Sequence, residues 1–152
     1  MKYIGLLLLS LLASCSNPEN INPKVLALNG TWSSACLENT QDFNIFGAYV
    51  IDVHTFTNGN YYSNLTQYSD INCTEAASET QEETGIVTFV EEVTTESGVT
   101  ANKVQFEVIS TYLNRPPTYE TLIYIDSNIL YFGAFLDDLN VLFFNSPYMK
   151  ED

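Results

Sequence analysis

The stretch Ala48–Tyr68, with the sequence AYVIDVHTFTNGNYYSNLTQY, decides the fold class of this protein. Two runs rich in β-branched and aromatic residues flank Asn58-Gly59, a pair of residues that both tolerate positive φ angles. An Asn-Gly pair between two such runs is a strong signal for a tight hairpin turn. We therefore expect two antiparallel strands, Ala48–Phe56 and Asn60–Tyr68, joined by that turn.

The same pattern continues on both sides of this hairpin. Short apolar runs alternate with turn residues, and no stretch after the first fifteen residues shows a convincing helical period of 3.6 residues. Six further strands are expected: Thr31–Leu37, Gly85–Val93, Asn102–Ser110, Thr118–Ile125, Ile129–Phe135 and Asn140–Phe144. Eight short strands joined mostly by hairpins predict an all-β fold, a single antiparallel up-and-down barrel, because closure removes exposed sheet edges. A β-sandwich is the alternative.

Length and composition narrow the range of partners. A chain of 152 residues is the size of one domain, and an apolar content of 45% is enough to fill a core, which excludes wholesale disorder. The chain carries 19 acidic and 5 basic side chains, a formal net charge of −14. Nucleic acid is therefore not an expected partner, because its phosphates would be repelled.

The first fifteen residues, MKYIGLLLLSLLASC, have a different character from the rest. Lys2 supplies a positive charge, and Ile4–Ala13 is a nearly unbroken apolar run. A membrane-spanning helix needs about 20 apolar residues, so this run is too short to be one. It fits instead the apolar region of a secretion signal that is removed from the mature protein.

Leu12-Ala13-Ser14-Cys15 resembles the lipobox of bacterial lipoproteins at all four positions. That resemblance implies cleavage just before Cys15 and attachment of fatty acyl chains such as palmitate to it, which would anchor the protein to a membrane. Ser16, in place of Asp, resembles the lipoproteins that are sent to the outer membrane of the bacterial cell envelope. An ordinary signal peptide with a chance cysteine is the alternative. The expected organisation is a signal peptide at 1–14, a lipid-anchored tether at 15–29 and a barrel domain at 30–152.

Two cysteines remain once Cys15 is acylated. An exported compartment permits oxidation, so a disulfide between Cys36 and Cys73 is the default expectation. A metal site or a redox pair would be the alternatives, but the two cysteines lack CxxC spacing and His54 is the only histidine of the sequence. We therefore expect a disulfide, with no metal and no cofactor.

Asn29-Gly30-Thr31-Trp32 opens the first expected strand and carries a second resemblance. It is similar to the glycine-x-tryptophan start of lipocalin-like barrels, which implies that Trp32 plugs one end of the barrel. Together with YSDINCT (68–74) and NSPYMK (145–150), it resembles small exported bacterial proteins of unassigned function. Lipocalins usually carry an arginine on the last strand that packs over the tryptophan, whereas residues 141–144 of the expected last strand include no basic side chain.

The ionisable residues of this sequence do not form part of a known catalytic motif. Asp52 and His54 are two residues apart and so lie on one strand face, an arrangement that could tune a general base or hold a zinc ligand. Neither GxSxG nor HExxH accompanies them, and a solvated pair of side chains is the simpler interpretation. We expect a non-catalytic protein.

Aromatic residues on the expected strands are the most suggestive feature. An eight-stranded barrel is just wide enough either to be packed solid by such rings or to hold one small ligand. The candidates for lining a ligand cavity are Tyr62, Tyr124, Tyr131 and Phe143. The leading hypothesis is a lipid-anchored binding module for a small apolar ligand or an envelope component. The alternative is a protein-interaction or inhibitor lipoprotein whose acidic surface binds a basic partner such as a lysozyme.

Overall fold

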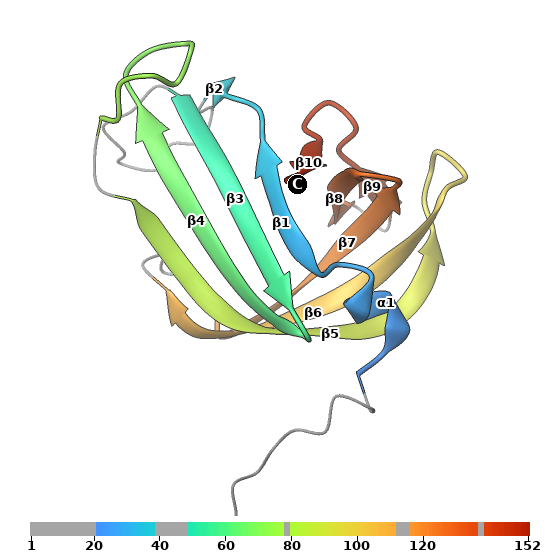
Figure 1. The fold of residues 1–152 in the computed structure, drawn as a ribbon. Helices are drawn as coiled ribbons and strands as arrows, with labels where there is room; N and C mark the ends of the chain where they lie inside the picture. Colours follow the sequence, from blue (N-terminus) through green and yellow to red (C-terminus); the bar gives the residue numbers. More distant parts are fainter. Residues whose placement is uncertain (1–20, 39–48, 78–79, 112–115, 137–138) are drawn as a thin grey trace, which may run out of the picture.

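A barrel of antiparallel strands is the main feature of the computed structural model (Figure 1). The structure describes residues 21–38, 49–77, 80–111, 116–136 and 139–152, so the expected signal peptide and Cys15 lie outside the described residues. The elements, in chain order, are α1 (Pro23–Leu26), β1 (Gly30–Ser34), β2 (Leu37–Glu38), β3 (Tyr49–Thr57), β4 (Asn60–Tyr68), β5 (Gln81–Thr94), β6 (Thr100–Thr111), β7 (Thr118–Asp126), β8 (Ile129–Leu136), β9 (Leu139–Leu142) and β10 (Tyr148–Lys150).

Strand β1 closes the barrel because it pairs with a neighbour along each of its edges. It is antiparallel to β3 on one side and to β10 on the other. The ring runs β1–β10–β8–β7–β6–β5–β4–β3, with β2 and β9 as additional strands attached to β3 and β8. This confirms the predicted all-β fold with an eight-stranded antiparallel barrel, and the sheet is one closed ring rather than the two packed sheets of a sandwich.

The predicted central hairpin is confirmed. Strands β3 and β4 pair in continuous register down to Thr57 and Asn60. Asn58 and Gly59 form the turn between them with φ angles of 50° and 81°. Both residues therefore occupy the left-handed region that the Asn-Gly pair was expected to reach.

The first and the last of the predicted strands differ from those in the structure. The first expected strand, Thr31–Leu37, is divided into β1 and β2. The last expected strand, Asn140–Phe144, corresponds to β9, which pairs with β8 and lies outside the ring. The eighth strand of the barrel is instead β10, which spans only three residues after Pro147. A strand of that length has too few residues to display an alternating pattern.

A short helix covers one end of the barrel (Figure 1). In α1 the Asn22 side chain accepts a hydrogen bond from the Lys24 amide, and Pro23 occupies the first turn, as is typical of a helix start. Val25 and Leu28 are buried in the main core, so part of the stretch expected to be a tether packs against the barrel. Within the described ranges, no helix has the length and apolar character needed to cross a membrane.

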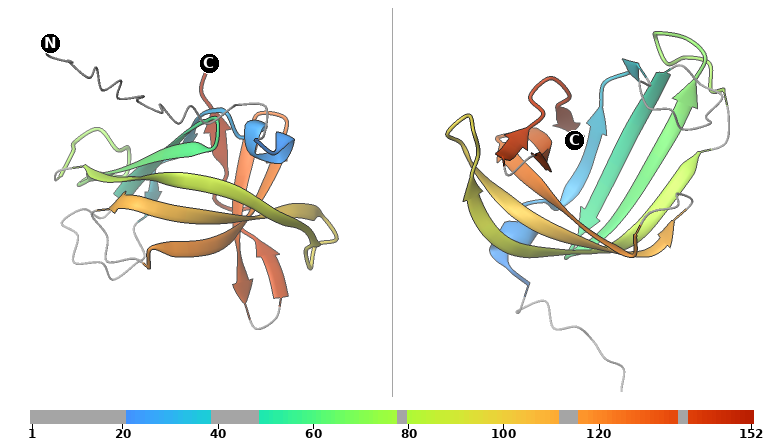
Figure 2. Two further views of the ribbon diagram at one scale, coloured as in Figure 1. Left: turned by 90° about the horizontal axis from the view of Figure 1, so that it is seen from below. Right: turned by 180° about the vertical axis from the view of Figure 1, so that it is seen from behind.

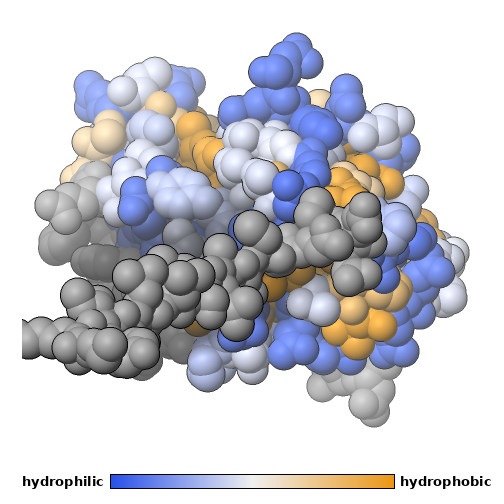
Figure 3. Space-filling view, turned by 60° about the horizontal axis from the view of Figure 1, so that its bottom comes forward, coloured by the Kyte–Doolittle hydropathy of each residue, from blue (hydrophilic) through white to orange (hydrophobic). Residues whose placement is uncertain are grey.

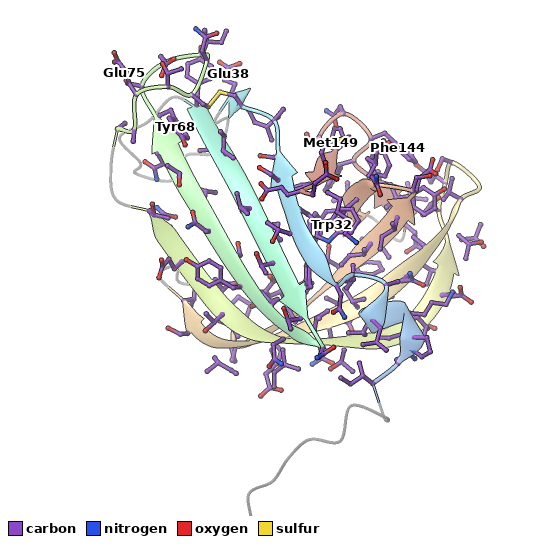
Figure 4. All side chains as sticks on the ribbon, viewed as in Figure 1. Trp32, Glu38, Tyr68, Glu75, Phe144 and Met149 are labelled. Carbon is purple, nitrogen blue, oxygen red and sulfur yellow. A yellow bond between two sulfur atoms is a disulfide. The ribbon has the colours of Figure 1, made fainter. Side chains whose placement is uncertain are left out.

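Trp32 lies on β1 at the end of the barrel that α1 covers (Figure 4). Its side chain is 1% exposed, and its indole nitrogen donates a hydrogen bond of 2.7 Å to the Leu28 carbonyl. The ammonium group of Lys150, on β10, lies 5.1 Å from the centre of the Trp32 ring, within the range of a cation–π contact. The basic residue that the expected last strand lacked is therefore supplied by β10, as a lysine.

A second, smaller apolar cluster lies outside the main core, where β5 and β6 extend past the other strands (Figure 2). Ala101, Leu122 and Leu142 are its buried members. The β5–β6 hairpin is joined to β9 by two hydrogen bonds: the Glu96 amide donates to the Asn140 carbonyl, and the Asn140 side-chain amide donates to the Thr94 carbonyl. Elsewhere, the face seen in Figure 3 shows separate apolar patches among hydrophilic residues.

The predicted disulfide is confirmed: Cys36, between β1 and β2, is bonded to Cys73, after β4 (Figure 4). Their Cα atoms are 5.8 Å apart. The bond ties the loop that follows β1 to the loop that follows β4, across the end of the barrel opposite α1 (Figure 1).

We expect loss of this disulfide to lower the free energy of unfolding by about 4 kcal/mol, because it closes a loop with a sequence separation of 37 residues in the unfolded chain. Urea unfolding of the oxidised and the reduced protein measures the difference. The doubly substituted variant Cys36→Ser/Cys73→Ser is the control and should unfold at the same urea concentration with and without reductant. Equal stability of oxidised and reduced wild type would contradict the expectation.

Candidate functional site

The interior of the barrel has a packed half and a hollow half. The main core comprises Val25, Leu28, Trp32, Phe56, Tyr61, Val87, Val104, Phe106, Ile123 and Leu130. On β3 the core residue is Phe56, at the end near α1, while Asp52 and His54 line a cavity further along the same strand. Strands β4 and β8 show the same arrangement, with a core residue near α1 and cavity-lining residues further along the strand. Core and cavity therefore occupy opposite ends of the barrel.

The cavity has a volume of about 350 Å³, at the lower end of the range usual for small-molecule sites. Its lining is mixed in character. The described polar side chains are Asp52, His54, Ser63, Gln81, Glu82, Glu83, Tyr119, Thr121 and Tyr148, and the aromatic ones include Phe106, Phe132 and Phe143. A cavity with this lining can hold a molecule that has both a flat apolar part and a polar group.

Asp52 is the centre of one hydrogen-bond network in the wall. Its Oδ2 atom accepts from His54 Nε2 at 2.9 Å and from the Tyr148 hydroxyl at 3.0 Å, and Ser63 donates to Oδ1 at 3.4 Å. Burial alone acts to raise the pKa of Asp52, but attraction to His54 and the hydrogen bonds from His54, Tyr148 and Ser63 outweigh it. The pKa of this carboxyl therefore lies below its usual 3.8, and the group is ionised at neutral pH.

The second ring nitrogen of His54 lies in the same wall. Nδ1 is buried and has no hydrogen-bond partner among the described residues. The His54 ring packs between Phe132 and Tyr148, with ring centres 4.9 Å and 5.3 Å away. Buried polar atoms in proteins are nearly always paired, so this nitrogen is an exception among the described residues.

Glu83 is the centre of a second network, on β5. The residue is only 6% exposed, and its carboxylate accepts hydrogen bonds from Tyr61 at 2.9 Å, Thr111 at 3.0 Å and Tyr119 at 3.2 Å. Burial raises the pKa of the Tyr61 hydroxyl, and the neighbouring Tyr119 and Glu83 raise it further. The Tyr61 hydroxyl therefore keeps its proton and donates it to Glu83 throughout the physiological range.

Aromatic rings separate the two networks. Phe106 stacks on Tyr119 with ring centres 5.1 Å apart, and it meets the edge of Tyr61 at 4.7 Å. Phe132 packs edge-on against Tyr148 at 5.1 Å. The rings that hold the hydroxyl donors are thus fixed by packing, so the donors are already oriented before a ligand arrives.

Of the four aromatic residues that the sequence singled out, Phe143 lines the cavity. Tyr62 lies on the outer face of β4, where its hydroxyl donates to Glu82 at 2.7 Å. Tyr124 and Tyr131 stack on each other with ring centres 6.0 Å apart and pack against the second apolar cluster, on the outside of the barrel. The structure thus brings one of the four to the cavity.

The structure places Asp52 and His54 in a different environment from the one predicted from the sequence. They were expected to be a solvated pair, but their side chains are only 19% and 14% exposed and line the cavity. The sequence of β3 could have predicted this position. Side chains alternate along a strand, so Asp52, His54 and Phe56 share one face, and Phe56 points into the core. Glu83 gave no such signal, because it stands in an acidic stretch.

We expect Asp52→Asn to lower the free energy of unfolding by about 2 kcal/mol near pH 7, since the charge-assisted hydrogen bonds to Asp52 are weakened. The pKa is depressed in the folded protein, so the contribution of ionised Asp52 is present above the unfolded value and is lost as pH falls through the folded one. The difference between wild type and variant should therefore shrink below about pH 4.

Urea unfolding at a series of pH values measures this difference. Asp126→Asn, at an exposed position at the end of β7, removes the same charge outside the cavity and should change stability by less than about 0.5 kcal/mol. A difference for Asp52→Asn that stays constant down to about pH 2 would contradict the assignment of an ionised, hydrogen-bonded Asp52.

Comparison with known proteins gives no relative from which a function could be transferred. No protein-family model, no curated protein and no solved structure matches this sequence. Among the described residues, no group of three or more histidine, cysteine or acidic side chains is arranged to hold a metal ion. The geometry of the cavity is therefore the basis for a functional proposal.

Proposed function

We propose that this protein is a lipid-anchored lipoprotein of the bacterial cell envelope whose barrel binds a small molecule without transforming it. The observation that carries the proposal is the cavity of about 350 Å³ in the half of the barrel away from α1. A barrel whose rings packed it solid would have no place for a ligand, whereas this one is filled only at the end that Trp32 closes.

The walls of the cavity have the character of a binding site. Two carboxylates, several hydroxyl groups and a histidine converge on a space that also exposes aromatic rings. Polar side chains held by packed rings impose an orientation on a ligand, and the rings supply contact area. This lining suits a small molecule with a polar group better than the fully apolar ligand that the sequence suggested.

The hydrogen bonds around His54 favour binding over catalysis. Ser63 is the hydroxyl residue directly opposite His54 in the β3–β4 register, but its hydrogen bond goes to Asp52. The Nε2 atom of His54 is bonded to the same carboxylate. A Ser-His-Asp nucleophile would need the serine hydroxyl on the histidine, so the described groups do not form that arrangement.

The envelope location rests on the sequence and on one structural feature. Leu12-Ala13-Ser14-Cys15 resembles a lipobox, and an acylated Cys15 would hold the domain at a membrane surface. The disulfide between Cys36 and Cys73 is compatible with an oxidising, exported compartment. The exposed end of the barrel would then face the fluid of that compartment.

We expect the full chain, expressed in a bacterium and grown with radiolabelled palmitate, to carry the label and to sediment with membranes. Cys15→Ala should abolish labelling and release most of the protein from the membrane fraction, because acyl chains provide about 0.8 kcal/mol for each buried methylene group. Ser16→Ala keeps the acceptor cysteine and should remain labelled. Labelling that survives Cys15→Ala would contradict the anchor.

Native mass spectrometry of the protein purified from its own membrane tests ligand binding. We expect a retained small molecule, which Ser63→Trp should exclude because the indole side chain would occupy the cavity. Ser110→Trp, at an exposed position on β6, is the control and should keep the molecule. A retained basic protein in place of a small molecule would favour the interaction alternative, and equal retention by both variants would place the ligand outside the barrel.

A further inference from the structure

We propose that the ligand of this barrel is a small organic cation, a protonated amine attached to a flat apolar body. The inference rests on the proposed binding function and names the chemical class of the ligand. The amine would lie between the Asp52 and Glu83 networks, and the apolar body would pack on Tyr119 and Phe132.

The charge of the lining sets the sign of the ligand. The carboxylates of Asp52 and Glu83 face the cavity, whereas Glu82, the next residue to Glu83 on β5, directs its side chain to the outer face; His54 is the basic side chain among the described lining residues. Even with His54 protonated, two carboxylates and one imidazolium give a formal charge of −1. An anionic ligand would be repelled inside a low-dielectric space, whereas a cation would be attracted.

The spacing of the two networks leaves room for the amine. His54, Ser63 and Glu83 lie in one row across β3, β4 and β5. Since neighbouring strands are about 4.8 Å apart, His54 and Glu83 are separated by about 10 Å along the wall. An ammonium group seated over Ser63 would therefore be within reach of both carboxylate networks.

His54 provides an acceptor that fits an ammonium donor. Because Nε2 is hydrogen-bonded to Asp52, a ring with one proton carries it on Nε2 and leaves a lone pair on Nδ1. That Nδ1 atom is buried without a hydrogen-bond partner among the described residues. In the neutral ring this atom is an acceptor, which the donor of an ammonium group would complement, whereas in a protonated ring it would itself be a donor.

The aromatic rings of the cavity and the net negative charge of the protein also favour a cationic ligand. Tyr119 and Phe132 line the cavity with partly exposed rings, and such rings attract organic cations. The whole chain carries a formal net charge of −14, and the ammonium groups of Lys24 and Lys103 are paired with surface glutamates. Negative potential at the mouth of the barrel would concentrate cations there.

Three probes of the same shape test the sign of the ligand charge: 2-phenylethylamine, 2-phenylethanol and phenylacetate. Isothermal titration calorimetry of the full chain measures their affinities. We expect the amine to bind at least about tenfold more tightly than the alcohol, and phenylacetate to bind most weakly. Equal affinities, a preference for the alcohol or the acid, or no binding of any of the three would overturn the inference.

Substitutions locate the amine. Asp52→Asn and Glu83→Gln should each reduce the preference for the amine over the alcohol at least about fivefold, since each removes one negative charge from the wall. Glu107→Gln removes the same charge from an exposed position next to Phe106 on β6 and should leave the preference unchanged. If Glu83→Gln does not fold, Asp52→Asn alone locates the amine.

The two proposals can fail separately. A neutral or acidic molecule retained in native mass spectrometry and excluded by Ser63→Trp would support a ligand-binding barrel and overturn the cationic class. Binding of 2-phenylethylamine that is unaffected by Asp52→Asn, Glu83→Gln and Ser63→Trp would overturn both, because the amine would then bind outside the cavity.

Discussion

The closure of the sheet through β1 is the constraint on which the rest of this structure depends. In that strand Trp32 is in register with His54 on β3 and with Lys150 on β10, so one short segment supplies hydrogen bonds to both edges. Once eight strands form a ring, their number limits the internal diameter. The size of the inward-facing side chains then decides which part of the interior is filled and which part stays open.

The distribution of large and small side chains explains why the barrel is hollow at one end. Bulky residues such as Phe106 meet near the middle of the ring, whereas Ser63, Thr121 and Gly133 face the cavity. Gly133 is required by the backbone there, because a Cβ atom at this position would lie 2.2 Å from the Val141 carbonyl oxygen. The same Cβ atom would lie 3.1 Å from the side chains of Leu122 and Leu142, so Gly133 permits the close approach of β9 to β8 on the side of the second apolar cluster.

The sequence was sufficient to predict the barrel, but not the residues inside it. The turn at Asn58-Gly59 is encoded locally, and the disulfide follows from the count of cysteines. The cavity depends on which face of each strand points inward, and adjacent rings such as Tyr61 and Tyr62 give no indication of this. Tyr124 faces outward against the second apolar cluster, which no local pattern reveals. Polar residues were assigned to solvent, although Asp52 lies inside.

Stability alone does not explain two buried carboxylates in one small domain. Replacing buried charged groups by apolar residues of similar volume is often neutral or stabilising, so a solid apolar barrel would be the simpler solution. Here each carboxylate accepts hydrogen bonds from several hydroxyl or imidazole donors. The packing around Trp32 and the disulfide at the opposite end stabilise the ring without contributions from the cavity. That separation allows polar groups to remain in the wall, oriented toward the interior, where they would be available to the cationic ligand that we propose.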